Sequence, residues 1–255
     1  MPDPGMLAEF LAGARVDQEV FALRPDYRAL LVTAHGLVPG PSDDAGDALL
    51  KEAEAAARTA LAGRPAEELP HVAAWREAYR AFGAKPQRTR NSLEALLRRA
   101  ESGLPRVNRL TDLYNAVSVL HQVPLGGEDL DRYASAPRLI RAVGTEPFDT
   151  AAGGAAVIEH PDPGEVVWCD DGGVTCRRWN WRQGRRTQLR EDTTTALFIL
   201  DALDPMTDDA LEAAASELVA RLTGLAPGAR IARRLLAVGG CDKECDKECA
   251  KEMDQ

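Results

Sequence analysis

The stretch VNRLTDLYNAVSVLHQVPLGG, Val107 to Gly127, carries the clearest helical pattern of the chain. At about 100° per residue, its apolar residues fall on one face of a predicted helix from about Arg109 to His121: Leu110, Leu113, Val117 and Leu120. The opposite face carries Asn108, Asp112 and Asn115, which are short acids and amides, whereas a solvated helix face usually carries long charged side chains. Two interpretations stay open: an exposed polar face with Asn108 as its N-cap, or a partly buried polar site.

The sequence patterns on either side of this helix predict mainly helices before it and mainly strands after it. The first third alternates helices with one strand at about Arg28–Ala34. Asn91 begins a helix with a capping-box-like pattern, because its side chain can accept from the Glu94 amide while Glu94 reaches back to the Asn91 amide. After VPLGG, β-rich runs are separated by Gly, Pro and Asp: RLIRAVG, AAVIEH, EVVWCD, VTCRRWNWRQ and TALFILDA. A helix capped by Thr207 follows the last of them.

The motif CRRWNWRQ, Cys176 to Gln183, places two tryptophans around one asparagine, with arginines on both sides. If Thr175–Gln183 is a single strand, Trp179 and Trp181 point to one face, whereas the other face carries Arg178, Asn180 and Arg182. The rings have enough apolar area to favour packing under a helix. We therefore predict a structural aromatic face and a functional polar face.

The 255-residue chain has a net charge of −9, but its charges are unevenly distributed. Residues 176–190 contain six arginines and no acid, and residues 76–109 contain nine basic residues against three acids. Two basic islands in an acidic chain are what a phosphate-binding surface would require, and the residues assigned to nucleic-acid binding are Arg88, Arg90, Arg185 and Arg186. The alternative is a chain that prefers arginine to lysine, with its islands on different faces.

The two ends of the chain bear on its localisation and its domain boundaries. The start has no basic segment followed by an apolar run, and no later stretch is apolar for long enough to span a bilayer, so we expect a cytoplasmic protein without membrane association. Cys241, Cys245, Cys249 and Met253 recur every four residues and could hold copper(I) or zinc, but their spacing matches no standard zinc site. We therefore expect no metal or other cofactor, one domain over residues 1–229, and a helical or disordered cysteine-repeat tail over residues 230–255.

The chain contains none of the common catalytic motifs, since GxSxG, HExxH, a Walker loop and GxGxxG before a helix are all missing. None of its four histidines belongs to a recognisable catalytic pair. Asp112 and Glu146 remain the candidate general bases.

The sequence from Asn91 to about Leu203 resembles a known family. The resemblance rests on NSLEALLRRAESGLPRVNRLTDLYNAVSVLHQVPLGGEDLD, on LIRAVG-TEPF, and on CRRWNWRQGRRTQLREDTTTALFILDAL. These segments look like a free-standing relative of the B-three/B-four domain, the tRNA-binding and editing domain of the bacterial phenylalanyl-tRNA synthetase β subunit. WNWRQ looks like a signature of the free-standing branch. The resemblance implies an α+β fold, in which helices flank a mixed sheet.

The resemblance also implies a function, which is hydrolysis of the ester of wrongly charged tRNA. Such a site needs a positioned water and donors for the developing oxyanion. Asn108, Asp112 and Asn115 match family motif positions, and Asn180, Arg182 and Gln183 offer donors suited to an ester carbonyl or phosphate. We assign catalysis to Asp112, Asn180 and Glu146, and substrate binding to Asn108, Asn115, Arg178, Arg182 and Gln183.

One departure affects the functional assignment. Many synthetases have a histidine shortly after the Pro-Leu pair, where this chain has Gly126 and Gly127. The leading hypothesis is a hydrolase that edits mischarged aminoacyl-tRNA in trans. A non-catalytic module that binds RNA or an amino acid, and a small-molecule enzyme on the same fold, are the alternatives.

Overall fold

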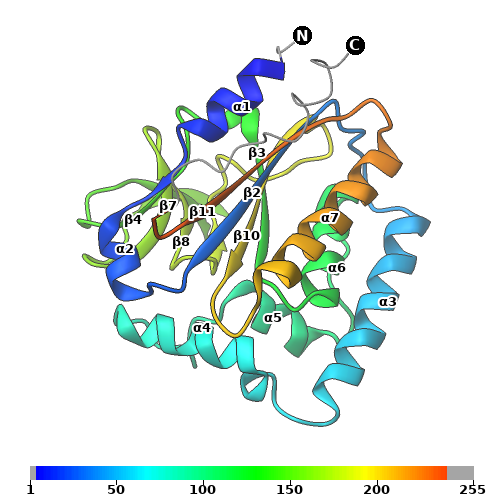
Figure 1. Ribbon diagram of the computed structural model, residues 1–255, viewed down its shortest axis with the longest axis horizontal. Coiled ribbons are helices and arrows are strands. Elements are labelled where there is room, and N and C mark those ends of the chain that lie inside the picture. The colour runs from blue at the N-terminus through cyan, green and yellow to red at the C-terminus, as the bar shows by residue number, and fades with distance from the viewer. Residues whose placement is uncertain (1–3, 240–255) are drawn as a thin grey trace, which may run out of the picture.

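A run of helices precedes a run of strands in the computed structural model, which describes residues 4–239 (Figure 1). The helices are α1 (Pro4–Ala12), α2 (Gln18–Leu23), α3 (Asp44–Leu61), α4 (Pro70–Ala81), α5 (Ser92–Arg99), α6 (Arg109–Leu120) and α7 (Asp208–Leu225). The strands are β1 (Arg15–Val16), β2 (Arg28–His35), β3 (Leu125–Asp129), β4 (Arg138–Arg141), β5 (Phe148–Ala152), β6 (Ala155–Glu159), β7 (Val166–Asp170), β8 (Gly173–Arg177), β9 (Arg182–Gln183), β10 (Thr195–Ala202) and β11 (Arg230–Ala237). The predicted α+β class is confirmed.

The inner layer of the fold is a four-stranded sheet with the order β11-β2-β10-β3, in which all neighbouring strands are antiparallel. All eight residues of β10 are buried, as are the six central residues of β2. A strand that is buried at consecutive positions must be covered on both faces of its sheet. This sheet therefore lies between two other layers.

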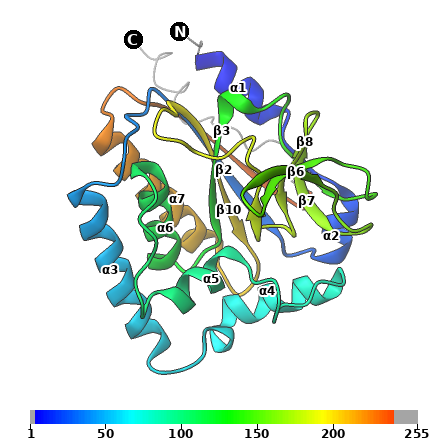
Figure 2. The same cartoon turned by 180° about the vertical axis from the view of Figure 1, so that it is seen from behind.

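Successive residues of β2 point into different layers, as the two-residue period of a strand requires. Leu30, Val32 and Ala34 pack in one core cluster with residues of α3, α6 and α7. Leu31 packs in a second cluster that contains residues of the other large sheet. Figure 1 shows the three helices on one side of β2 and β10, and Figure 2 shows β7 and β8 on the other.

The second large sheet has the order β1-β4-β7-β8-β9 and is mixed, since β1 and β4 are parallel and the other pairs are antiparallel. It packs against the inner sheet through Leu139 of β4 and Trp168 of β7, which share a cluster with Ile199 of β10. In both views, α4 and α5 lie along one end of the two sheets (Figure 2). The end of the sheets that these two helices cover contains the site described below.

The N-terminus of α5 confirms half of the predicted capping box. Asn91 accepts a hydrogen bond from the Glu94 amide at 2.8 Å. The Glu94 carboxylate, however, makes no hydrogen bond to the Asn91 amide; it accepts from Arg76 at 2.7 Å and from Arg98 at 3.0 Å. Glu94 is fully buried, and a buried carboxylate is costly unless a cation compensates it, so the ion pairs replace the expected cap.

The boundary predicted at residue 229 is wrong. Residues 230–237 form strand β11, which pairs with the whole of β2, from Arg230 opposite His35 to Ala237 opposite Arg28. Because β11 is an edge strand with several exposed residues, its sequence RIARRLLA lacks the apolar pattern of a buried strand. The cysteine repeat from Cys241 onward lies outside the described residues.

Candidate active site

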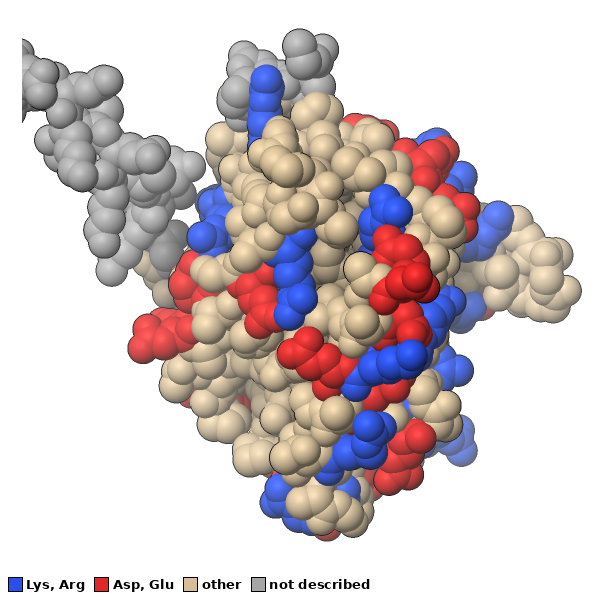
Figure 3. Space-filling model, turned by 90° about the vertical axis from the view of Figure 1, so that its right-hand side faces the viewer, with Lys and Arg blue, Asp and Glu red and all other residues tan. Residues whose placement is uncertain are grey.

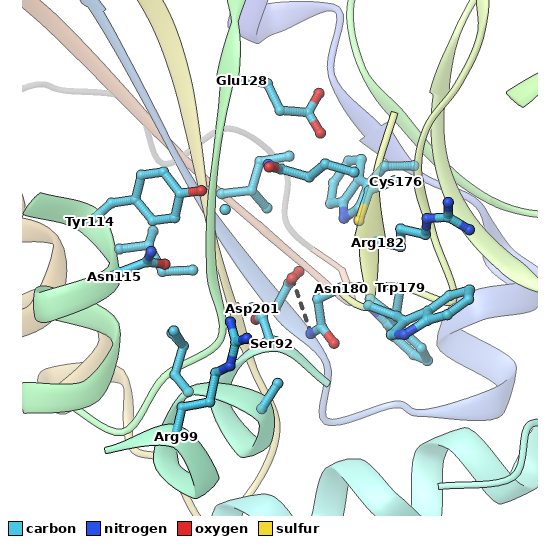
Figure 4. Close-up of a pocket in the computed structure, with 18 residues that line it drawn as sticks. Ser92, Arg99, Tyr114, Asn115, Glu128, Cys176, Trp179, Asn180, Arg182 and Asp201 are labelled. Atoms are coloured by element: carbon cyan, nitrogen blue, oxygen red, sulfur yellow. Dashed lines mark hydrogen bonds between the residues drawn. The ribbon is translucent and has the colours of Figure 1, made fainter. Parts of the chain in front are cut away.

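A cavity of about 240 Å³ lies where the two large sheets meet near α5. Its walls come from β3 and β10 of the inner sheet, from β7, β8, β9 and the turn between β8 and β9, and from α5 and α6. Figure 4 shows these elements converging on one space. Asn115, Asn180, Arg182 and Gln183 line it, so the structure brings together four of the residues predicted from the sequence.

The segment that connects β8 and β9 is a turn, so the prediction of one continuous strand over Thr175–Gln183 is wrong. Cys176 pairs with Gln183 and Arg177 with Arg182 across the hairpin. Between them, the φ angles of Arg178 and Trp179 are 47° and 66°. Residues other than glycine adopt positive φ at a cost, and such positions are concentrated at functional sites. The turn carries Asn180 to the cavity wall.

The two tryptophans of the motif do not share a face. Trp179 is completely buried and packs edge to face against Tyr27, at a ring-centroid distance of 4.9 Å, and Trp75, at 5.3 Å. Trp181 is only partly buried and lies under the guanidinium of Arg178, which is 4.6 Å from its ring centroid. Both rings border the cavity, but the prediction of a core ring is correct only for Trp179.

Asn180 is held by two buried side chains. Its Oδ1 accepts a hydrogen bond from the Tyr79 hydroxyl at 2.9 Å, and its Nδ2 donates to Asp201 Oδ2 at 3.2 Å. The other oxygen of Asp201 accepts from the Tyr27 hydroxyl at 2.5 Å. Asn180 and Tyr27 therefore orient the Asp201 carboxylate, which also lines the cavity (Figure 4).

Two buried carboxylates, Glu128 on β3 and Asp201 on β10, line the cavity. Burial raises the pKa of Glu128 to about 7, although the Tyr133 hydroxyl bonded to it works in the opposite direction. Burial likewise raises the pKa of Asp201 to about 7, against the hydrogen bonds from Tyr27 and Asn180. Neither forms an ion pair with any residue of the described chain. Both can therefore exchange a proton near neutral pH.

The sequence predictions did not include these two acids. Asp201 could have been found from its position, because it ends the apolar run TALFIL in a buried strand, where an ionisable residue is unusual. Glu128 lies in the GGED segment, which gives no apolar context to mark it as buried.

The raised pKa values predict that the unfolding free energy falls as the pH rises. The folded protein binds a proton on Glu128 up to about pH 7, whereas the unfolded chain releases it near the ordinary value of 4.5. The stability that this proton contributes is complete below about pH 4 and is lost as the pH rises through 7. Glu128→Gln should therefore gain on the order of 1–3 kcal/mol relative to wild type between pH 5 and pH 8, as measured by urea unfolding. Equal pH dependence in the two proteins would contradict the assignment.

The polar side of α6 divides between structural and cavity positions. Asn108 is the N-cap, because its Oδ1 accepts from the Thr111 amide at 2.9 Å. Asp112 is fully buried outside the cavity, where it accepts from the Val107 amide and the Ser42 hydroxyl. Asn115 lines the cavity, is only 8% exposed, and has no hydrogen-bond partner for its amide among the described residues.

The cavity residues belong to a family segment that comparison with known proteins identifies. The family model of the B3/4 domain matches residues 74–222, which is more than half of the chain. The chain belongs to the B3/4 domain family. All residues that line the cavity, from Ser92 to Asp201, lie inside the matched segment. The B3/4 segment thus provides the whole cavity, whereas β2 and β11 of the inner sheet lie outside it.

Solved structures include distant likenesses. The chain is similar to an N-terminal fragment of the phenylalanyl-tRNA synthetase β subunit from Pyrococcus horikoshii, at 13% identity and a TM-score of 0.44. The match covers 86% of this chain and 49% of that fragment, so this chain corresponds to about half of its length. No curated protein matches the chain.

The remaining predicted substrate-binding residues take two positions around this B3/4 cavity. Gln183 lines the cavity and donates from Nε2 to the Gly127 carbonyl at 2.9 Å, which leaves its second N–H available. Arg182 lies in the wall, beside the ring of Trp181. Arg178 instead lines a separate cavity of about 410 Å³, which it shares with Arg88.

Three of the four arginines assigned to nucleic-acid binding, Arg90, Arg185 and Arg186, lie close to acids. Arg185 pairs with Asp149 at 3.3 Å, and Arg90 is 3.5 Å from buried Glu94. Arg186 donates to the buried carboxylate of Asp170, so its charge stabilises the core. On the face that α3 covers, basic and acidic residues are interspersed (Figure 3). Asp149 and Asp170, which lie outside the island of residues 176–190, thus offset the charge of two of its six arginines.

Glu146 lies outside the cavity and stabilises a loop. Its carboxylate accepts from the backbone N–H groups of Val143, Gly144 and Thr145. Partial burial works to raise the pKa of Glu146, but these donors outweigh it and hold the pKa below its ordinary value. A carboxylate satisfied in this way is poorly placed to act as a base on a ligand in the cavity.

Within residues 4–239, no helix has the length and apolarity needed to cross a membrane. No cluster of three or more His, Cys, Asp or Glu side chains in that range is arranged to hold a metal ion.

Proposed function

We propose that this B3/4 domain protein hydrolyses the ester bond of mischarged aminoacyl-tRNA, with the amino acid bound in the cavity between the two sheets. The observation that carries the proposal is the pair of buried, unpaired carboxylates in that cavity, both with a pKa of about 7. The B3/4 resemblance supports the choice of substrate. An acid that titrates near neutral pH suits proton transfer, because it can be ionised before the reaction and protonated during it.

Asp201 is the candidate general base. Its carboxylate takes a proton from a water molecule, and the water oxygen attacks the ester carbonyl carbon to form a tetrahedral intermediate. The free N–H groups of Asn115 and Gln183 are the candidate donors to its oxyanion. The bond between the carbonyl carbon and the ribose oxygen then breaks, and the proton on Asp201 passes to that oxygen. The products are the free amino acid and uncharged tRNA.

Arg99 is the candidate contact for the tRNA end. It extends from α5 toward the cavity (Figure 4), is exposed, and pairs with no acid among residues 4–239. An unpaired guanidinium beside a cavity can bind a phosphate through charge-assisted hydrogen bonds. Glu128 lies across the cavity from Arg99 in Figure 4, so the bound amino acid would extend from the Arg99 side toward Glu128.

The test is hydrolysis of a panel of mischarged tRNAs by the purified protein. We expect at least one aminoacyl-tRNA to lose its amino acid well above the uncatalysed rate, measured as release of labelled amino acid. Glu146→Gln should retain this activity, because Glu146 lies outside the cavity. If tRNA binds but no member of the panel is hydrolysed, the protein is a non-catalytic module, a function that the glycine at position 126 also fits.

A further inference from the structure

The two cavity acids differ from the buried acids that this chain pairs with arginine. Three buried carboxylates are compensated in this way: Glu94 by Arg76 at 2.7 Å, Glu165 by Arg177 at 2.8 Å, and Asp170 by Arg186 at 2.5 Å. Glu128 is only 2% exposed and Asp201 only 3%, yet both lack a cation among the described residues. Neutral groups donate to both of them, Tyr133 to Glu128 and Tyr27 with Asn180 to Asp201. A buried anion that has only neutral donors is costly, so a positively charged ligand group would be favoured here.

The aromatic part of the cavity wall also suits a cation, although the side chains of Arg99 and Arg182 line other parts of it. The rings of Tyr114, Trp168 and Trp179 line it, and the negative face of an aromatic ring attracts a cation. Asn115, more than nine-tenths buried, has an amide with no partner among residues 4–239, and the buried Ser92 hydroxyl has none either. Buried polar groups are normally hydrogen-bonded, so these two indicate a polar ligand that contacts them.

We propose that the amino acid bound in this cavity has a basic side chain, whose ammonium group contacts the carboxylate of Glu128. This inference rests on the proposed function, since it takes the ester to lie at Asp201. It goes further in naming the substrate class, which is an aminoacyl group of the lysine or ornithine type. A neutral side chain of similar length would leave Glu128 uncompensated.

Binding of such a ligand should release protons. The charged and titratable groups that act on Glu128 are Tyr114, Tyr133, Cys176, Asp201 and the guanidinium of Arg186. Of these, Arg186 is the cation, and it is bonded to Asp170. Without a ligand, Glu128 therefore keeps its proton up to about pH 7. An ammonium group beside it would favour the ionised form of Glu128.

The experiment is isothermal titration calorimetry with amino acid amides, which contain no ester to hydrolyse. We expect lysinamide to bind the wild-type protein at least tenfold more tightly than norleucinamide, its neutral analogue, and than tyrosinamide. Glu128→Gln should abolish that preference. Glu101→Gln should keep it, because Glu101 is exposed, forms no ion pair among the described residues and does not line the cavity. Equal or tighter binding of norleucinamide or tyrosinamide would overturn the proposal, as would a preference that survives in Glu128→Gln.

A second measurement needs only the wild-type protein. Titrations at pH 6.5 in buffers of different ionisation enthalpy should show proton release with lysinamide and less with norleucinamide; equal release would overturn the proposal. The two hypotheses can fail separately. A preference for lysinamide with no tRNA hydrolysed would reject the editing activity alone. Hydrolysis of a tRNA that carries a neutral amino acid, but not of lysyl- or ornithyl-tRNA, would reject the basic side chain alone.

Discussion

Asp201→Asn is expected to lower the rate of aminoacyl ester hydrolysis by about 10²–10⁴-fold, the usual contribution of a general base. The asparagine keeps the size of the side chain and can still hydrogen-bond with Tyr27 and Asn180, but it cannot accept a proton from water. The measurement is the single-turnover rate on the tRNA that the wild-type protein hydrolyses best. The wild-type rate should also rise with pH up to about 7 and then level, because the pKa of Asp201 is about 7.

Asp209→Asn is the matched control for this variant. Asp209 lies exposed in the first turn of α7, without an ion pair among the described residues, so its replacement should leave the rate unchanged. An Asp201→Asn protein that is folded by circular dichroism and retains the wild-type rate would show that Asp201 is not the base.

Trp179→Ala is expected to reduce the unfolding free energy by about 3–5 kcal/mol, the typical cost of removing a buried aromatic side chain. Trp179 is completely buried, and its ring contacts Tyr27, before β2, and Trp75 and Phe82, in α4 and at its C-terminal end. No small rearrangement can fill the space that the indole leaves, because these neighbours are themselves held in the core. Urea unfolding at pH 6 measures the effect.

Trp181→Ala is the comparison that the same motif provides. Its side chain packs against the same core cluster but is only partly buried, and its ring lies beside the guanidinium groups of Arg178 and Arg182, so we expect a smaller loss, of about 1 kcal/mol or less. If the two substitutions lowered the unfolding free energy equally, the difference in burial between Trp179 and Trp181 would not determine their contributions to stability.

The regular elements could be predicted from the sequence because their patterns are local. The stripe of Leu110, Leu113 and Val117 placed α6 correctly, and Asn91 and Asn108 are N-caps as their positions suggested. Strand β11 was missed because an edge strand lacks the run of apolar residues that marks a buried strand. Its pairing with β2 also connects residues about 200 positions apart.

The candidate site could be predicted only in part, because its geometry depends on contacts between distant segments. Asn115 and Asn180 were identified by residue type and position, and both line the cavity. The turn at Arg178 and Trp179 was not predicted, because the alternation of aromatic and polar residues along CRRWNWRQ fits a strand. Neither residue is a glycine, which would have indicated a positive φ. Asp112 was assigned to catalysis because residue type alone cannot distinguish an acid that anchors a loop from one that faces a ligand.

The position of β10 in the inner sheet limits how the B3/4 segment can be isolated. The family match begins at residue 74, after β2 has ended, and stops at residue 222, before β11 begins. In the whole chain, β2 pairs with β10 along all eight of its residues. A polypeptide cut at the family limits would therefore leave one side of β10 without a neighbour, with a long row of apolar residues and open backbone groups that favours self-association. The cavity residues all belong to the family segment, but β2, the strand that pairs with the whole length of the strand that carries Asp201, comes from the first 73 residues.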